Sequence, residues 1–137
     1  MRRNKVVVIS MDAPVYEDIE YLSGRASFSY LLSNGSVIER MRSIYPTITY
    51  PCYITMSTEC YYDNHGIVNN TFDIAVKNPP WIFDRKHVRC EDIFDAAKRA
   101  GYITASVGWP ITGWHKIVDY LVNESRPVSV LPSRQGR

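Results

Sequence analysis

The sequence has few cysteines, no long hydrophobic run and almost no excess of charge of either sign. Its three cysteines, Cys52, Cys60 and Cys90, are odd in number and lack the CxxC spacing, so they indicate neither a disulfide framework nor a zinc knuckle. No stretch approaches the length of a membrane-spanning helix, and Val6–Met11 is too short for a signal peptide. We therefore expect a cytoplasmic protein with no membrane partner.

The charge balance also excludes a general affinity for polyanions. The 16 basic and 14 acidic side chains leave a net charge of +2, and the basic residues are scattered. This gives no argument for a nucleic-acid polymer as partner. An apolar fraction of 45% and a charged fraction of 22% are typical of a globular chain that buries a core, and 137 residues fit one domain.

The first part of the chain predicts strands and one short helix. Residues 5–10 form a continuous β-branched run, which is typical of a strand buried on both faces in a parallel sheet, and Pro14 forbids its continuation. Residues 27–33 predict a short helix, and residues 36–43 alternate enough to predict a second strand.

The later part of the chain predicts two more helices and a third strand. Thr49 followed by Pro51 is typical of a helix start, with the hydroxyl as N-cap and the proline in the first turn. The clearest helix spans residues 91–100, and residues 102–107 follow it as a strand. This order favours an α/β fold with a mainly parallel sheet.

Three polar features stand at the ends of these elements. Asp12 follows the first predicted strand, Thr49 begins a helix, and Asn69–Asn70 follow a His65–Gly66 turn. A hydroxyl at a helix N-terminus meets unpaired backbone N–H groups and the positive end of the helix dipole, which favour an incoming phosphate. It still needs a metal or a base for activation, and Asp12 could hold a cation there.

The linear motifs carry a resemblance to a known family. Val-Ile-Ser-Met-Asp12, Tyr-Pro-Thr-Ile-Thr49-Tyr-Pro and His65-Gly-Ile-Val-Asn-Asn70 resemble the opening motifs of the type I phosphodiesterase/nucleotide pyrophosphatase family of the alkaline phosphatase superfamily. The resemblance covers roughly residues 5–122. It implies an alkaline-phosphatase-like, three-layer α/β/α fold with a mainly parallel sheet, incomplete in this chain, and two zinc ions at the strand ends.

The resemblance also implies roles for the three motif residues. Asp12 matches a zinc-binding aspartate, Thr49 matches the nucleophile, which also contacts the metal, and Asn70 matches an asparagine that donates to a phosphoryl oxygen. The implied activity is hydrolysis of phosphodiester or nucleotide pyrophosphate bonds in small molecules, through a phosphothreonine intermediate.

Two departures from the family pattern qualify this expectation. Glu59 stands where many members have glycine, which strains the turn if the backbone there needs a positive φ. The other metal ligands of the family lie well downstream of Asn70, and we expect residues 1–125 to be the N-terminal portion of the catalytic domain, with residues 126–137 an irregular tail. An incomplete sheet would leave a hydrophobic edge, so we expect self-association.

Two alternative functions stay open. The chain could be a catalytically silent α/β fragment that serves only as a structural or self-associating module. It could also belong to a phosphomonoester or sulfate-ester hydrolase of the same superfamily.

The remaining polar and aromatic residues are interpreted as structural. His65 fits a turn better than a ligand role, and His87 and His115 have no second ligand at a usable spacing. Trp81, after Pro79–Pro80, fits a substrate lip or a packed loop equally well. Core or rim positions are expected for four tyrosines that could otherwise line a base-stacking slot: Tyr50, Tyr53, Tyr61 and Tyr62.

Overall fold

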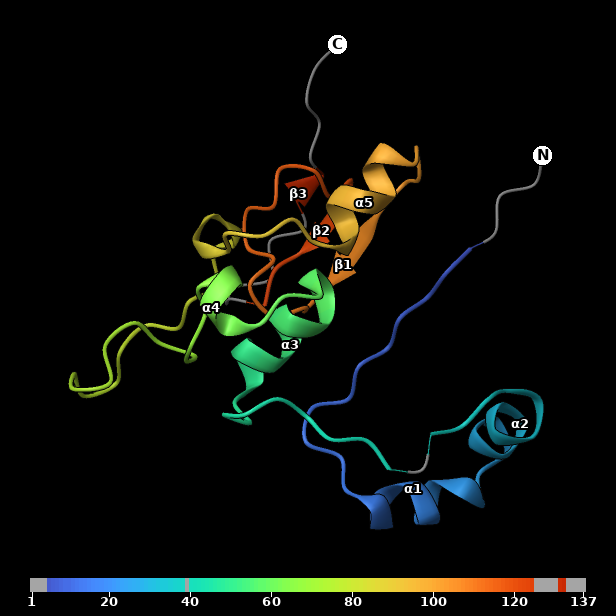
Figure 1. Ribbon diagram of the computed structural model, residues 1–137. Helices are drawn as coiled ribbons and strands as arrows, with labels where there is room; N and C mark the ends of the chain where they lie inside the picture. Colours follow the sequence, from blue (N-terminus) through green and yellow to red (C-terminus); the bar gives the residue numbers. More distant parts are fainter. Residues whose placement is uncertain (1–4, 39, 125–130, 133–137) are drawn as a thin grey trace. The chain divides into compact units, whose positions relative to one another are not determined.

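The computed structural model describes residues 5–38, 40–124 and 131–132, and the chain divides into two compact units at Arg42. Unit 1 comprises residues 1–42 and unit 2 residues 43–137. Figure 1 draws both. Within the described residues, no helix is long and apolar enough to cross a membrane.

Unit 1 contains two short helices that contact each other, α1 (Tyr16–Ser23) and α2 (Ala26–Asn34). The α1 start is stabilised by acids in its first turn, where Asp18 accepts a hydrogen bond of 2.9 Å from the Val15 N–H. The helix predicted at residues 27–33 is confirmed as α2, whereas α1 was not predicted.

The two strands predicted in unit 1 are wrong for this structure. Residues 5–10 are extended but form no strand, and Val6 and Ile9 are 81% and 83% exposed. Residues 36–38 and 40–43 also form no strand. A β-branched run becomes a strand only when a neighbouring strand takes up its N–H and C=O groups, and no described segment pairs with either run.

Unit 2 begins with α3 (Thr49–Thr58) and α4 (Tyr62–His65), which pack against each other. The helix predicted at Thr49 is confirmed, but Ile48 and not Thr49 is its N-cap, and Thr49 is its first residue. Glu59 ends α3 with a φ of 56°, so the glutamate does occupy a left-handed position that favours glycine.

A 3₁₀ turn, η1 (Arg85–His87), precedes α5 (Ile93–Arg99). The helix predicted at residues 91–100 is therefore confirmed in a shorter form. Asp92 is its N-cap and accepts hydrogen bonds from the N–H groups of Phe94 and Asp95. Lys98 and Arg99 lie in the last turn, where cations are favourable to the helix dipole.

The sheet of unit 2 has the order β1–β2–β3, with β1 (Ala105–Val107), β2 (Tyr120–Val122) and β3 (Leu131–Pro132). Strands β1 and β2 are parallel, and β2 and β3 are antiparallel. The third predicted strand is confirmed as β1. The helices and the parallel pair agree with the α/β class, but the sheet is too small to show three layers. Apart from β3, the predicted tail at residues 126–137 lies outside the described residues.

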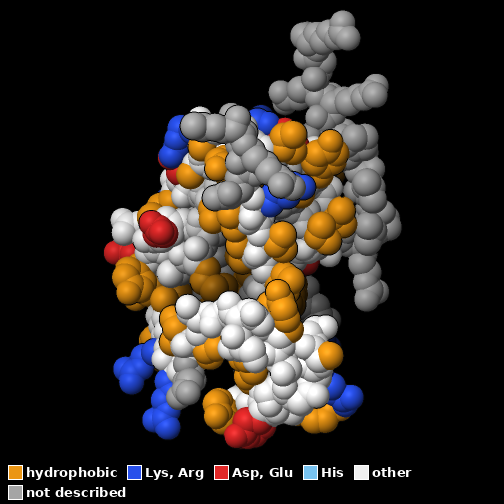
Figure 2. All heavy atoms as spheres, turned by 90° about the vertical axis from the view of Figure 1, so that its right-hand side faces the viewer, with side chains coloured by type: hydrophobic (Ala, Val, Ile, Leu, Met, Phe, Trp, Pro, Cys, Tyr) orange, Lys and Arg blue, Asp and Glu red, His pale blue; other side chains and the backbone are white. Residues whose placement is uncertain are grey.

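The core of unit 2 lies between α3 and the segments that follow it. Its buried hydrophobic cluster consists of Tyr50, Ile54, Ile67, Ile82, Val88 and Ile111. The core position is confirmed for Tyr50 and Tyr53, which are buried, whereas Tyr61 and Tyr62 are exposed. Many other hydrophobic side chains lie at the surface, as Figure 2 shows for one face.

Candidate active site

Of the three motif residues, Thr49 and Asn70 lie in unit 2, and Asp12 lies in unit 1. Asp12 is exposed, at a bend that follows the extended run of residues 5–10. The residue after it, Ala13, has a φ of 51°, so the chain turns sharply there. Asp12 is thus in a turn rather than at the end of a paired strand.

Thr49 stands at the start of α3, half-buried. The N-cap Ile48 has no side chain that could accept from the first turn, so the helix needs an acceptor from elsewhere. Asn70 supplies it, since its Oδ1 accepts a hydrogen bond of 2.9 Å from the Tyr50 N–H. Pro51, at the third helical position, has no N–H to satisfy. The sequence-predicted residues Thr49 and Asn70 are therefore brought together at one helix end.

Asn70 is held in place by its backbone as well. Its N–H donates to Asn69 Oδ1 at 2.7 Å, and its carbonyl oxygen accepts from the Ile82 N–H at 2.8 Å. Because Oδ1 is the acceptor for Tyr50, the Nδ2 amide is the group of Asn70 that can donate to a ligand. We call Thr49 and Asn70 the Thr49–Asn70 pair.

Tyr50, next to Thr49, connects this helix end to two other segments. Its ring packs edge-on against Trp81 with centroids 5.3 Å apart, and its hydroxyl donates to Glu124 Oε2 at 2.7 Å. Burial, followed by the hydrogen bond to Glu124 and its charge, raises the pKa of Tyr50. Tyr50 therefore stays neutral and fixes the start of α3.

Trp81 is an exposed aromatic residue that contacts Tyr50 at the start of α3. A single antiparallel bridge joins Thr71 to Trp81, which holds the indole beside the segment that carries Asn70. The side chain is 55% exposed although it contacts Tyr50. Of the two interpretations left open by the sequence, the geometry agrees better with a partly open lip than with a fully packed loop.

His65 is structural, as its position in the sequence indicated. It is fully buried, Nδ1 accepts from the Ile67 N–H at 3.1 Å, and Nε2 lies 3.1 Å from Thr55 Oγ1. Because Nδ1 is an acceptor, the neutral ring carries its proton on Nε2 and donates to Thr55. Burial lowers the pKa of His65, against the opposing charge of Asp63.

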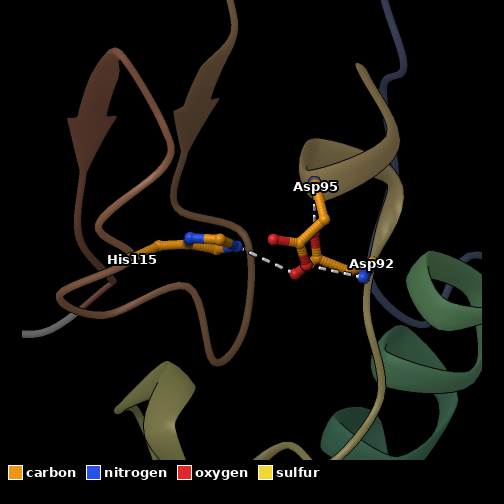
Figure 3. A group of neighbouring side chains, drawn as sticks. All are labelled: Asp92, Asp95 and His115. Carbon is orange, nitrogen blue, oxygen red and sulfur yellow. Dashed lines mark hydrogen bonds and ion pairs between the residues drawn. The ribbon is translucent and has the colours of Figure 1, made fainter. Parts of the chain in front are cut away.

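A second polar cluster was missed by the sequence reasoning. We call it the Asp92 network, and it consists of Arg85, Asp92, Asp95 and His115. Figure 3 shows His115 pointing at Asp92, with Nε2 3.0 Å from Oδ2. The sequence offers His115 no second ligand at a usable spacing, but the fold brings it to Asp92 from a distant part of the chain. The one local signal was the pair Asp92 and Asp95, which forms a capping box.

Asp92, Asp95 and His115 have the residue types of a metal site, but both oxygens of Asp92, Oδ2 of Asp95 and Nε2 of His115 already have hydrogen-bond partners. The Arg85 guanidinium lies 2.7 Å from Asp92 Oδ2 and 3.2 Å from Asp95 Oδ2, where it supplies the positive charge. Oδ1 of Asp92 caps α5. Burial opposes ionisation of Asp92, but the hydrogen bond and charge of His115 and the charge of Arg85 lower its pKa to about 2. The cluster is therefore a buried ion-pair network, and not the zinc site that the resemblance implies.

The residues that the resemblance assigns to zinc do not complete a site either. Asp12 and Thr49 offer one carboxylate and one hydroxyl, whereas zinc in proteins takes four ligands. Asp119 does not add to them, because its Oδ2 accepts from the N–H and the hydroxyl of Thr104 and its Oδ1 pairs with Lys98. A zinc site therefore needs ligands besides Asp12 and Thr49.

Comparison with known proteins settles the family. A model of the type I phosphodiesterase/nucleotide pyrophosphatase family matches residues 6–132. The chain belongs to this family. The family is one of hydrolases and is metal-dependent in general.

Two human proteins are among the relatives of this chain. It is 24% identical to ectonucleotide pyrophosphatase/phosphodiesterase family member 5 over 98% of this chain and 28% of that protein. It is 30% identical to family member 1 over 60% of this chain and 10% of that protein. The chain thus spans less than a third of the length of these relatives.

Proposed function

We propose that the protein hydrolyses phosphodiester or nucleotide pyrophosphate bonds of small molecules in a metal-dependent reaction, with Thr49 as its nucleophile. The observation that supports this best is the hydrogen bond from the Tyr50 N–H to Asn70 Oδ1, 2.9 Å long. It sets a hydroxyl and an amide donor at one helix N-terminus, where backbone dipoles favour a phosphate.

Each group of this pair has a role in the proposed reaction. The Thr49 Oγ loses its proton and attacks phosphorus as the bond to the leaving oxygen breaks. This gives the protonated first product and a phosphothreonine that still carries the rest of the substrate. Water then cleaves the phosphothreonine and restores the hydroxyl. Asn70 Nδ2 donates to a phosphoryl oxygen as negative charge develops on it. The hydroxyl needs an activating base or metal. Asp12 would help to hold such a metal only together with further ligands.

We further propose that the preferred substrate carries an aromatic group, either on the part that leaves or on the part that stays bound to Thr49. Trp81 is 55% exposed beside Tyr50, and the two rings meet in a T-shaped arrangement with centroids 5.3 Å apart. A planar base can stack on an exposed indole ring. This favours nucleotide esters over simple phosphomonoesters or sulfate esters. The complete three-layer α/β/α fold and the cytoplasmic location belong to the same proposal.

The test is hydrolysis of the nitrophenyl ester of TMP by the full-length protein, with zinc added. Thr49→Ala is expected to lower kcat/KM by about 10³-fold or more, because it removes the nucleophile. Thr47→Ala is the matched control, since Thr47 is an exposed neighbour whose hydroxyl only donates to the Ile44 carbonyl. Acid quenching during turnover should trap TMP bound to the Thr49 oxygen through its phosphorus. Equal rates for the wild type and Thr49→Ala would refute the assignment.

A further inference from the structure

Helix α3, which begins at Thr49, is in contact with the segments that follow the two parallel strands of unit 2. Strands β1 and β2 pair side by side, and just beyond β1 the Gly108 N–H donates to the Val122 carbonyl oxygen at 2.9 Å. The chain continues from these strand ends to Trp109 and Glu124. In open α/β sheets, ligands bind outside the carboxyl ends of the strands. The contacts between these two residues and α3 therefore concern the side of the sheet at which ligands bind.

Two tyrosines of α3 make these contacts, and they differ in what holds them. Tyr50 and Tyr53 are three positions apart, so they lie on one side of the helix. The Tyr53 ring meets Trp109 edge-on with centroids 5.1 Å apart, and its hydroxyl has no hydrogen-bond partner among the described residues. The Tyr50 hydroxyl, in contrast, donates to Glu124 Oε2 at 2.7 Å. The Tyr53 side chain is thus held by packing, whereas that of Tyr50 is also held by a directed bond to a carboxylate.

Tyr50 also contacts the groups to which the proposed reaction assigns a role. It directly follows Thr49, its N–H donates to Asn70 Oδ1 at 2.9 Å, and its ring contacts Trp81. The residue is only 1% exposed, so the surrounding atoms leave its side chain little room to move. A change in how the Tyr50 side chain is held is therefore transmitted to the backbone that carries the Thr49 hydroxyl.

We propose that Glu124 is a positioning residue for the hydrolysis proposed above, and that it sets the orientation of the Thr49 hydroxyl by holding the hydroxyl of Tyr50. This role rests on the proposed function. Glu124 takes no part in making or breaking bonds. A hydrogen bond to a carboxylate is stronger than one between neutral groups, which suits it to fixing a helix end. Accurate placement matters for rate, because a displacement of about 1 Å can lower it about 100-fold.

The experiment measures hydrolysis of the nitrophenyl ester of TMP by the full-length protein with zinc, in a double-mutant cycle. Tyr50→Phe and Glu124→Ala should each lower kcat about tenfold, because each removes the same bond and lets the start of α3 shift. KM should stay within about twofold, since the groups that bind the substrate are retained. The double variant should be no slower than either single variant. Glu124→Gln should keep most of the activity, because its amide oxygen can accept from the Tyr50 hydroxyl.

Tyr53→Phe is the matched control. It removes a hydroxyl that has no partner among the described residues from the same side of the same helix, so kcat should not change. A second measurement does not depend on activity. Hydrogen exchange of the Tyr50 amide, which Asn70 protects, should be faster in Tyr50→Phe and Glu124→Ala and unchanged in Tyr53→Phe.

The outcomes separate this proposal from the proposed function. If the wild type is active and Thr49→Ala is not, a wild-type kcat in Tyr50→Phe and Glu124→Ala would overturn the positioning role alone. Losses that add in the double variant would also overturn it, because the two groups would then act independently. So would a raised KM with an unchanged kcat, which would make Glu124 a binding residue. Equal turnover by the wild type and Thr49→Ala would refute the proposed function, and the positioning role with it.

Discussion

The Thr49–Asn70 pair and the Asp92 network are two polar clusters of unit 2 that differ in how far their groups are already bonded. In the Asp92 network, the oxygens of Asp92 accept from Arg85, His115 and the first turn of α5. In the Thr49–Asn70 pair, Asn70 Oδ1 binds the Tyr50 N–H, and its Nδ2 donor has no partner among the described residues. Saturated groups stabilise a fold, whereas groups with unused donors can bind a ligand.

The difference shows that residue type alone does not identify a functional site. Two aspartates and a histidine lie within reach of one another, as in a metal centre, yet a guanidinium already supplies the cation. A threonine and an asparagine look less reactive, yet they lie at a helix N-terminus, and none of the described residues accepts a hydrogen bond from the amide donor of Asn70. The following predictions test whether the Asp92 network mainly affects stability and the Thr49–Asn70 pair mainly affects activity.

The largest effect is expected for Asp92→Ala. It leaves the Arg85 guanidinium and His115 without their main acceptor in a site where the Asp92 side chain is only 5% exposed. It also removes the N-cap of α5. Breaking a buried pair costs about 3–5 kcal/mol, so we expect a loss of unfolding free energy of that size in urea.

Glu91→Ala is the matched control for this change. Its carboxylate pairs with Arg99 at 2.7 Å, but both side chains are largely exposed, at 71% and 61%. Such surface pairs contribute about 0–1 kcal/mol. If Glu91→Ala destabilised the chain as much as Asp92→Ala, burial would not be what distinguishes the network.

The second prediction separates stability from chemistry at Asn70. Asn70→Ala removes the acceptor for the Tyr50 N–H and should cost about 1 kcal/mol, as for loss of a helix cap. Asn70→Asp keeps an acceptor and places a negative charge at a helix N-terminus, so stability should stay within about 0.5 kcal/mol of the wild type.

Activity should respond to both substitutions. Asn70→Asp lacks the Nδ2 donor, and both variants should lower the kcat of the full-length protein by about 10²-fold. The measurement pairs urea unfolding with hydrolysis of the TMP nitrophenyl ester. Full activity in a stable Asn70→Asp variant would contradict the proposed donation to a phosphoryl oxygen.

The sequence predicted the helices of this chain better than its strands. The α2, α3 and α5 segments carry local signals, such as Pro51 in a first turn and acids and bases at opposite ends of α5. Residues 5–10 carry an equally strong local signal, but a strand also requires a partner, which no local pattern specifies. The helix α1 was overlooked although Glu17 and Asp18 mark its first turn.

The polar residues of unit 2 also differ in whether a local sequence pattern marks them. Thr49 and Asn70 were selected because they lie in linear motifs, and in the structure Asn70 Oδ1 accepts from the N–H of Tyr50, the residue after Thr49. The Asp92 network depends on segments that meet only in the folded chain. Sequence spacing carries no information on such contacts unless a repeat or a known motif encodes them.

The smallest predicted effect is a difference in pH dependence between His65, which contacts Thr55 of α3, and the Asp92 network. Burial keeps the pKa of His65 below its ordinary value of 6.5, so the unfolded chain takes up a proton before the folded chain does. The stabilisation from neutral His65 is full above that value and is lost as pH falls through it. The Asp92 carboxylate, with a pKa of about 2 against an ordinary 3.8, contributes undiminished until pH falls below 3.8.

Between pH 7.5 and 5, acid should therefore weaken the segment that supports α3 while it leaves the Asp92 carboxylate ionised. The comparison is urea unfolding of the wild type and His65→Asn at both pH values, since the Asn amide oxygen can accept from the Ile67 N–H without titrating. The wild type should lose more unfolding free energy than His65→Asn over this range. Equal losses in the two chains would mean that another group carries the acid sensitivity, because the substitution removes only the titration of His65 and the Nε2 contact with Thr55.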